Sequence, residues 1–160
     1  MKFTLGILSL ILLASCSSKK NNSASTEAAL GASKEDSLEL SGSSDDRRAG
    51  GLRTVNFDFH SDRLTTDARK VLDADSDFLE KNPKVSVEIE GHCDERGSSQ
   101  YNLALGERRA KVVRDYLRAK GIKTSRMTII SYGKERPLEE GGAESARARN
   151  RRGAFVITGL

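Results

Sequence analysis

The sequence predicts an α+β domain of the two-layer sandwich type, in which helices cover one face of a mixed sheet of about four strands. Stretches with a two-residue apolar repeat alternate with stretches of helical repeat, in the order βαβαβ, followed by a short helix and a last strand. Each predicted strand has one apolar face, so one side of the sheet needs a cover of amphipathic helices. With 160 residues, 36% of them hydrophobic, the chain suffices for one ordinary globular domain.

The first strand and the first helix are expected between residues 52 and 83. In LRTVNFDF, Val55, Phe57 and Phe59 share one face and polar residues share the other, as in a half-buried strand. A helix follows, because apolar residues recur at helical spacing until Asn82 and Pro83 end it. The apolar face of this helix consists of Leu64, Ala68, Val71, Leu72, Phe78 and Leu79.

The remaining elements continue the same alternation. KVSVEIEGH is a predicted strand with Val85, Val87 and Ile89 directed inward. A long helix is expected over 99–120, and Gly121 is a favourable residue at its C-terminal end. Two further strands are predicted in MTIISY and GAFVITG, separated by a loop and a short helix near 143–150.

The segment DADSD in the first helix resembles the start of a calcium-binding loop. Such a loop needs glycine at its sixth position and glutamate at its twelfth, where this chain has Phe78 and Lys84. We therefore expect Asp73, Asp75 and Asp77 to form a solvated helix face.

The N-terminus has the layout of an export signal. In MKFTLGILSLILLASC, one positive charge at Lys2 precedes an apolar run that is short for a membrane span. The end of this run, Leu13 to Cys16, resembles the lipobox of bacterial lipoproteins, which implies that Cys16 becomes lipid-modified and N-terminal. In that class, Ser17 directs the product to an outer membrane. The alternative is an ordinary cleaved signal with a chance cysteine.

Residues 17 to about 50 are rich in Ser, Ala, Gly and charged residues, without a sustained apolar period, and are expected to form a flexible tether. The predicted organisation is a signal peptide at 1–15, a lipidated cysteine and tether at 16–50, and one domain at 51–160. If Cys16 carries lipid, Cys93 has no intramolecular partner and is a free thiol.

The charge composition favours an anionic partner. The formal net charge is +4 and the sequence pI is about 9.2. Only 5% of the residues are aromatic and none is tryptophan, so few side chains could stack on bases and a nucleic-acid partner is not expected.

The long predicted helix carries a polar anomaly on its apolar face. At 100° per residue, Asn102 and Arg109 fall on the same face as Leu105, Val113 and their apolar neighbours. Burying an unpaired guanidinium destabilises the folded protein by roughly several kcal/mol. Arg109 is therefore expected to meet a carboxylate from the fold, from a ligand, or from both. A structural ion pair without a ligand stays open as the alternative.

The stretch EGHCDERG, residues 90–97, gathers several reactive residue types. A metal site is not expected, because His92, Cys93 and Asp94 are consecutive, and neighbours in extended chain point to opposite faces. The same objection applies to a Cys93 nucleophile with a His92 base, although His60 could approach from the first strand. Gly91 and Gly97 instead suggest a tight loop that presents Asp94 at the entry to the long helix.

Four motifs together carry a family resemblance: VNFDF, VEIEGHCDERGSSQYNLALGERRAKVVRDYL, SYGKERP and ARNRR. In order and spacing they resemble the peptidoglycan-associated lipoproteins, which share the C-terminal domain of outer-membrane protein A. The resemblance spans about residues 52 to 158 and implies an OmpA-like fold. It also implies non-covalent binding of peptidoglycan through the diaminopimelate residue of its stem peptide, without enzyme activity or cofactor.

The resemblance also assigns the ligand-binding residues. Asp94 would accept the diaminopimelate ammonium, and Arg109 would take the carboxylate through its planar fork. Asn102 would hydrogen-bond the peptide, and Arg151 would hold the second carboxylate or order the pocket. Pairing of Arg151 with an acidic side chain of the domain stays open as the alternative.

Two positions depart from the family pattern. His60 stands where relatives commonly have Asp or Asn, and its imidazole could change the pH dependence of binding. Cys93 stands where Ala or Thr is frequent and is taken as a small residue of the pocket wall.

The resemblance further implies an outer-membrane lipoprotein whose domain faces the periplasm and whose partner is the periplasmic propeller protein of a Tol system. The enzyme alternative is a cysteine-dependent cell-wall peptide hydrolase or transpeptidase that uses Cys93.

Overall fold

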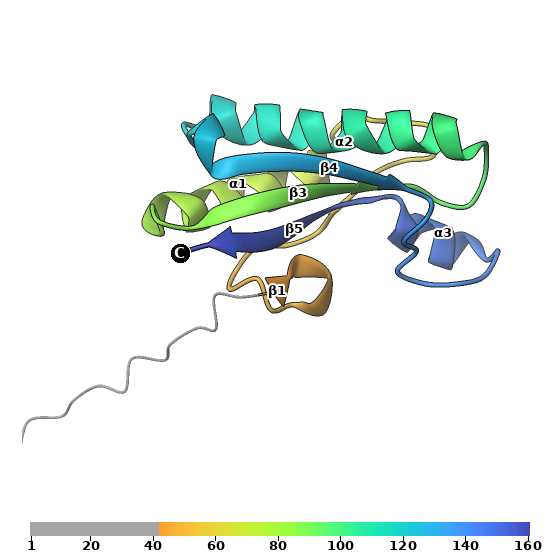
Figure 1. Ribbon diagram of the computed structural model, residues 1–160, viewed down its shortest axis with the longest axis horizontal. Helices are drawn as coiled ribbons and strands as arrows, with labels where there is room; N and C mark the ends of the chain where they lie inside the picture. The colour runs from red at the N-terminus through yellow and green to blue at the C-terminus, as the bar shows by residue number, and fades with distance from the viewer. Residues whose placement is uncertain (1–41) are drawn as a thin grey trace, which may run out of the picture. The chain divides into compact units, whose positions relative to one another are not determined.

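The structure, a computed structural model, describes residues 42–160. The predicted signal, Cys16 and most of the predicted tether lie outside the described residues. The described part is a mixed sheet with helices, as predicted, and α1 passes behind the sheet while α2 runs along its length (Figure 1). No helix among the described residues has the length and apolar character needed to cross a membrane. The helices are α1 Thr66–Lys81, α2 Ser99–Ala119 and α3 Glu144–Asn150, with 3-10 turns η1 Ser44–Asp46 and η2 Thr124–Arg126.

The sheet is mixed because its two central pairings differ in direction. β3 (Ser86–His92) runs parallel to β4 (Met127–Gly133) and antiparallel to β5 (Arg152–Gly159). A parallel pair needs a long crossover, and α2 supplies it between β3 and β4. The strand order is β1-β5-β3-β4, and β2 (Val55–Asn56) also pairs with β5, antiparallel. The mixed α/β architecture is confirmed, with five strands in place of about four.

The core lies between the sheet and the two long helices. Val85, Val87 and Ile89 are buried, as the two-residue repeat predicts. They lie in one cluster with residues of both helices and of β5, which include Leu72, Leu79, Val113, Leu117 and Phe155.

The prediction for Phe59 is wrong, because this ring is 45% exposed. The pairing of β2 with β5 ends at Asn56, and one further hydrogen bond joins the Phe57 amide to the Arg151 carbonyl at 2.8 Å. Beyond that bond the chain leaves the sheet, so the alternation no longer decides which way a side chain points.

The helix ends follow from local capping. The Thr65 side chain accepts a hydrogen bond from the Ala68 amide at the start of α1, and Ser98 does the same for the Tyr101 amide at the start of α2. The predicted end of the first helix is confirmed, since Asn82 is its C-cap and donates its side-chain amide to the Phe78 carbonyl at 2.8 Å. These caps fix where α2 begins, and therefore where the loop before it must turn.

The predicted tether boundary near residue 50 lies too late in the chain. β1 (Gly42–Ser43) pairs with β5, and Ala49 in the following segment is buried. The Ser44 hydroxyl accepts a hydrogen bond from the Phe155 amide at 2.9 Å, and Asp45 pairs with Arg152 at 2.8 Å. The domain therefore includes residues 42–50, because polar side chains there bind β5, and composition does not reveal such a contact.

The prediction that Asp75 belongs to a solvated face is also wrong, because Asp75 is fully buried. One of its carboxylate oxygens accepts a hydrogen bond from the Arg53 amide at 3.1 Å, and the other has no hydrogen-bond partner within the described part of the chain. Burial raises the pKa of this carboxyl to about 7, against smaller lowering effects of the Arg53 amide and charge. The residue holds the segment after η1 against α1.

α2 lies unusually close to β3, because two glycines face each other where they meet. A Cβ on Gly91 would overlap the Gly106 carbonyl oxygen, and a Cβ on Gly106 would overlap the Ser131 hydroxyl. The close approach sets the position of the first half of α2 above the end of β3.

Replacing Gly91 with alanine is expected to lower the free energy of unfolding by about 1–3 kcal/mol, because the helix backbone must move away from the strand. Urea unfolding followed by circular dichroism measures the change. Gly121→Ala is no equivalent control, because its φ is +101°. Gly142→Ala is suitable, since only the end of the Arg147 side chain lies near its Cβ, and it should cost far less. Equal losses in the two variants would contradict the packing argument.

Candidate functional site

A small pocket is lined by residues that follow β3, by the first turns of α2, by the loop after β2 and by the residue that follows α3. It is nearly filled by its own side chains, with about 10 Å³ of open space. All six predicted ligand-binding residues line it: His60, Cys93, Asp94, Asn102, Arg109 and Arg151. Phe59, Arg96, Tyr101 and Leu105 complete the lining.

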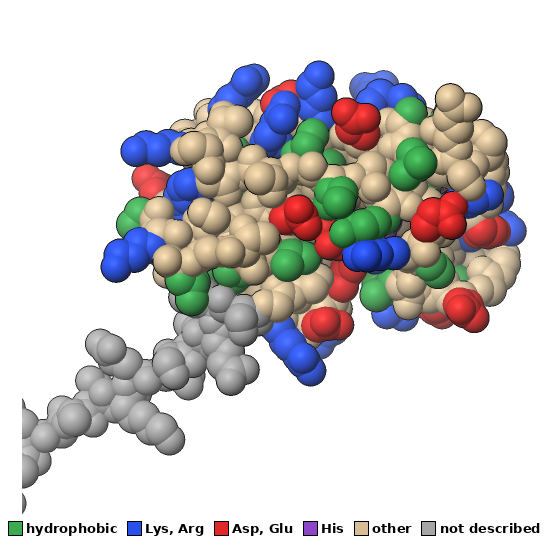
Figure 2. Space-filling view, in the orientation of Figure 1, with side chains coloured by type: hydrophobic (Ala, Val, Ile, Leu, Met, Phe, Trp, Pro, Cys, Tyr) green, Lys and Arg blue, Asp and Glu red, His purple; other side chains and the backbone are tan. Residues whose placement is uncertain are grey.

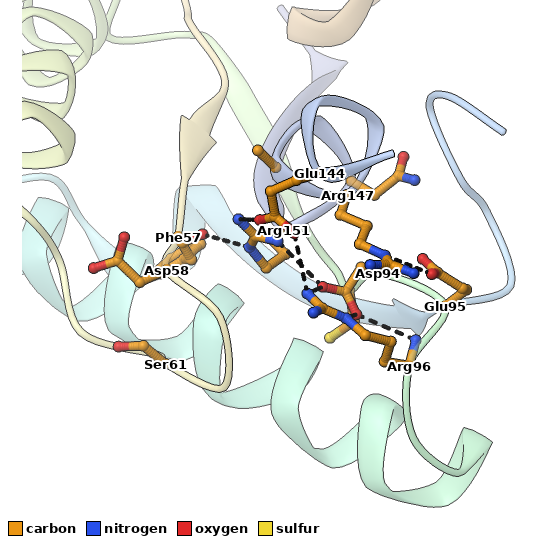
Figure 3. A network of polar contacts seen from close by, with 12 residues as sticks. Phe57, Asp58, Ser61, Asp94, Glu95, Arg96, Glu144, Arg147 and Arg151 are labelled. Atoms are coloured by element: carbon orange, nitrogen blue, oxygen red, sulfur yellow. Dashed lines mark hydrogen bonds and ion pairs between the residues drawn. The ribbon is translucent and has the colours of Figure 1, made fainter. Parts of the chain in front are cut away.

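Asp94 is the buried anion of the pocket, at 3% exposure. Figure 3 shows its carboxylate between the guanidinium groups of Arg96 and Arg151, at 2.6 and 3.3 Å. Burial acts to raise the pKa of Asp94, but hydrogen bonds from Arg96 and Arg151 outweigh it and hold the pKa below its ordinary value. Asp94 is therefore ionised at neutral pH and presents a fixed negative charge.

Arg151 is held from three sides. Its Nε donates to the Phe57 carbonyl at 3.1 Å, and its two terminal nitrogens pair with Asp94 at 3.3 Å and Glu144 at 2.9 Å (Figure 3). Arg151 thus pairs with acidic side chains of the domain, which is the alternative that the sequence left open. It joins the start of β5 to the pocket.

Arg109 is fully buried, as its place on the apolar helix face predicts, but its partners differ from the expected ones. No carboxylate contacts it among the described residues. Its guanidinium donates instead to the carbonyls of Asp58, Ser61 and His92, at 3.0, 2.9 and 2.8 Å. Backbone carbonyls of the loop after β2 and of the last residue of β3 therefore satisfy this charge, and burial lowers the pKa of Arg109. Three of its five N–H groups make these bonds, and a fourth points to the Cys93 sulfur, at 3.5 Å from the nitrogen. The fifth N–H has no partner among the described residues.

Asn102 and Cys93 form the floor of the pocket. The Asn102 side chain donates to the Arg96 carbonyl at 2.9 Å, and the Cys93 thiol lies 3.4 Å from the Asn102 carbonyl oxygen. Burial raises the pKa of the Cys93 thiol more than the nearby Arg109 charge lowers it. Within residues 42–160 no hydrogen bond joins this sulfur to a histidine.

His60 lies on the rim of the pocket with a left-handed φ of 54°. Asn, Asp and His tolerate this conformation better than most residues, so a histidine is compatible with the backbone here. Its Nδ1 is 2.9 Å from the Tyr101 hydroxyl. His60 therefore ties the loop after β2 to the first turn of α2.

An ion pair joins the loop that carries Asp94 to α3. Arg147 of α3 pairs with Glu95 at 2.7 Å (Figure 3). His92 points elsewhere, since its Nε2 is 3.2 Å from Glu90 on the same strand. Its ring therefore does not converge with Cys93 and Asp94, and residues 42–160 contain no group of three His, Cys, Asp or Glu placed to hold a metal ion.

Two important lining residues, Phe59 and Arg96, were not predicted. The strand repeat assigned Phe59 to the core. In the structure, the centre of its aromatic ring lies 3.7 Å from the Arg96 guanidinium carbon. Arg96 follows Asp94 by two residues, and this spacing was the available signal for an ion pair within the loop.

Comparison with known proteins shows the family. The OmpA family matches residues 56–151, which include the whole pocket. The chain belongs to the OmpA family. The peptidoglycan-associated lipoprotein of Brucella melitensis is 40% identical over 93% of this chain and 87% of its own length. That of Rhizobium meliloti is 40% identical over 93% and 83%.

Solved structures share this fold. The crystal structure of the peptidoglycan-associated lipoprotein from Burkholderia pseudomallei has a TM-score of 0.64 and 39% identity, over 66% of this chain and 90% of that one. The cell wall anchor of the T6SS from Pseudomonas aeruginosa has a TM-score of 0.58 and 26% identity, over 67% and 80%. The same fold thus occurs in a peptidoglycan-associated lipoprotein and in a cell wall anchor.

Proposed function

We propose that this protein is an outer-membrane lipoprotein that binds peptidoglycan non-covalently through the diaminopimelate residue of the stem peptide. The observation that carries the proposal is the ionised Asp94, buried at the bottom of a pocket whose other charged walls are arginines. The free end of diaminopimelate has one ammonium and one carboxylate, so it matches an anion and cations at fixed separation.

Each end of the ligand has a place in this scheme. The ammonium pairs with Asp94, whose carboxylate accepts hydrogen bonds only. The carboxylate receives the remaining N–H of Arg109 together with Arg151, which exchanges part of its contact with the exposed Glu144. Asn102 supports the pocket by holding the Arg96 carbonyl.

The relatives support this proposal, because proteins at 40% identity over nearly the whole chain bear the name peptidoglycan-associated lipoprotein. Attachment to the outer membrane by lipid on Cys16, after a signal peptide at 1–15, belongs to the proposal, as does a periplasm-facing domain. A partnership with the periplasmic propeller protein of a Tol system rests on the family resemblance.

The test is sedimentation with purified diaminopimelate-type sacculi. Asp94→Asn is expected to weaken binding at least about tenfold, because the neutral amide loses the charge pair with the ammonium. Asparagine keeps the size of the side chain, whereas alanine would remove one of the three contacts that hold the buried Arg151. Glu95→Gln in the same loop is the matched control, since Glu95 does not line this pocket. If the Asn variant binds as well as the wild type, the site assignment fails.

A second wall type tests the ligand itself. Sacculi with lysine in place of diaminopimelate lack the terminal carboxylate and should bind markedly less. Equal binding of both wall types would contradict the proposed ligand.

The cysteine-dependent hydrolase or transpeptidase predicts the opposite behaviour of Cys93. Cys93→Ala is expected to bind sacculi within about twofold of the wild type, because the thiol makes only weak polar contacts. Sacculus digestion followed by chromatography of the soluble products measures turnover. Release of peptide fragments by the wild type, lost in Cys93→Ala, would restore the enzyme alternative.

A further inference from the structure

The proposed cation position in the pocket is already occupied by the protein itself. Arg96 places Nη2 at 2.6 Å from one Asp94 oxygen and Nε at 3.3 Å from the other, a two-point contact between planar groups. This is the contact that a ligand ammonium would make. Arg96 therefore acts as an internal substitute for the ligand, and any cation that reaches Asp94 must displace it or share the carboxylate with it.

We propose that Arg96 is the specificity-determining residue of this pocket, because a ligand enters only by exchanging its ammonium for the Arg96 guanidinium on Asp94. The inference rests on the proposed function, and it names the residue that makes the pocket prefer a zwitterionic end over a simple amine.

Arg96 is the exchangeable partner of the two arginines on Asp94. The side chain of Arg151 is 8% exposed and is held by the Phe57 carbonyl and Glu144 as well. The side chain of Arg96 is 31% exposed and comes from the surface loop before α2. Displacing Arg96 therefore disturbs no buried part of the fold.

A released Arg96 has alternative partners close by. Its guanidinium lies 3.7 Å from the centre of the Phe59 ring, and Glu144 is 3.8 Å away (Figure 3 shows Arg96 beside Asp94 and Glu144). A cation on an aromatic face is stabilised without a fixed direction, so the group can turn on Phe59 while it leaves Asp94. The ligand carboxylate that Arg109 and Arg151 hold beside Asp94 would then be a further counter-ion for Arg96.

The charge balance of the pocket explains the preference. Three arginines, Arg96, Arg109 and Arg151, face two carboxylates, Asp94 and Glu144, so the pocket carries an excess of positive charge. A ligand with an ammonium alone adds to this excess and leaves the displaced arginine with only Glu144 as a counter-ion, which Arg151 already shares. A zwitterionic end adds no net charge and supplies the missing carboxylate. Discrimination here comes from a penalty on the wrong ligand as well as from attraction to the right one.

The experiment measures binding of two soluble peptides to the domain by isothermal titration calorimetry. One is L-Ala-γ-D-Glu-meso-diaminopimelate, and the other has L-lysine at the third position. The wild type is expected to prefer the first peptide by about tenfold or more. Arg96→Ala should bind the lysine peptide several-fold tighter than the wild type does, and the preference should fall below about threefold.

Two further variants make the result specific. Arg136→Ala removes an arginine that lies over the Tyr132 ring at the same 3.7 Å but outside the pocket, and it should keep the wild-type preference. Arg96→Lys keeps the charge without the planar fork and should keep a preference for the zwitterionic peptide.

The outcomes separate the two proposals. If the wild type binds neither peptide, the proposed function and this inference both fail. If the wild type prefers diaminopimelate but Arg96→Ala loses affinity equally for both peptides, or keeps the full preference, the function stands. In either case Arg96 is then an ordinary wall residue, and the exchange is overturned.

Discussion

Replacing Arg109 with methionine is expected to lower the free energy of unfolding by about 3–5 kcal/mol, the scale for removing one member of a fully buried polar network. Methionine has a similar length and fills much of the space, so a cavity is a small part of the loss. The carbonyls of Asp58, Ser61 and His92 lose their donor, and a buried acceptor without a partner costs about 1–3 kcal/mol. The loop after β2 should detach first, since two of the three carbonyls belong to it.

Denaturant unfolding of Arg109→Met beside Arg108→Met measures this effect. The Arg108 side chain is 48% exposed and pairs with Asp62 at 3.3 Å, so its loss should cost no more than about 1 kcal/mol. Binding of diaminopimelate sacculi should fall together with the order of the loop. A variant that keeps full stability but loses binding would show instead that Arg109 acts mainly on the ligand.

Replacing Asp75 with asparagine is expected to stabilise the domain at pH 8 by up to about 4 kcal/mol, the equivalent of the shift from 3.8 to about 7 in its pKa. The folded state keeps the carboxyl protonated at a pH where the unfolded chain ionises it. The contribution of Asp75 to stability is therefore full below about pH 4 and is lost as the pH rises from about 4 to about 7. Asparagine remains neutral and keeps the acceptor for the Arg53 amide.

Thermal unfolding between pH 4 and 8 tests this slope, with Asp77→Asn as the control on the exposed side of the same helix. The two curves for wild type and Asp75→Asn should meet near pH 4 and separate above it. Parallel curves would mean that Asp75 is ionised in the folded protein at neutral pH, with a partner for its second oxygen.

Local sequence patterns predicted the features that depend on residues close together in the chain. The repeat in KVSVEIEGH placed Val85, Val87 and Ile89 in the core, and the end of α1 at Asn82 followed from the residues there. Long-range polar contacts had no such signal. Residues 42–50 have the composition of a linker, yet Asp45 reaches Arg152 across 107 positions of the chain.

The sequence predicted which residues line the site, but not which groups they contact. Helix geometry marked Asn102 and Arg109 as polar residues on a buried face, and the family resemblance added Asp94, Arg151, His60 and Cys93. The partners of Arg109 are backbone carbonyls, and every residue type has a carbonyl, so no sequence pattern could point to them. The same holds for Asp75, whose burial depends on the Arg53 amide.

The two adjacent arginines at the start of β5 have a mechanical consequence. Arg151 forms an ion pair with Asp94 in the pocket, while Arg152 forms one with Asp45, near the N-terminal end of the described residues. A pull between the leading segment and a molecule held in the pocket would pass through the pairing of β1 with β5 and the Asp45–Arg152 ion pair, and from Arg151 to Asp94. These contacts are polar and belong to β1, η1, β5 and the pocket loop, so α1 is not part of this path.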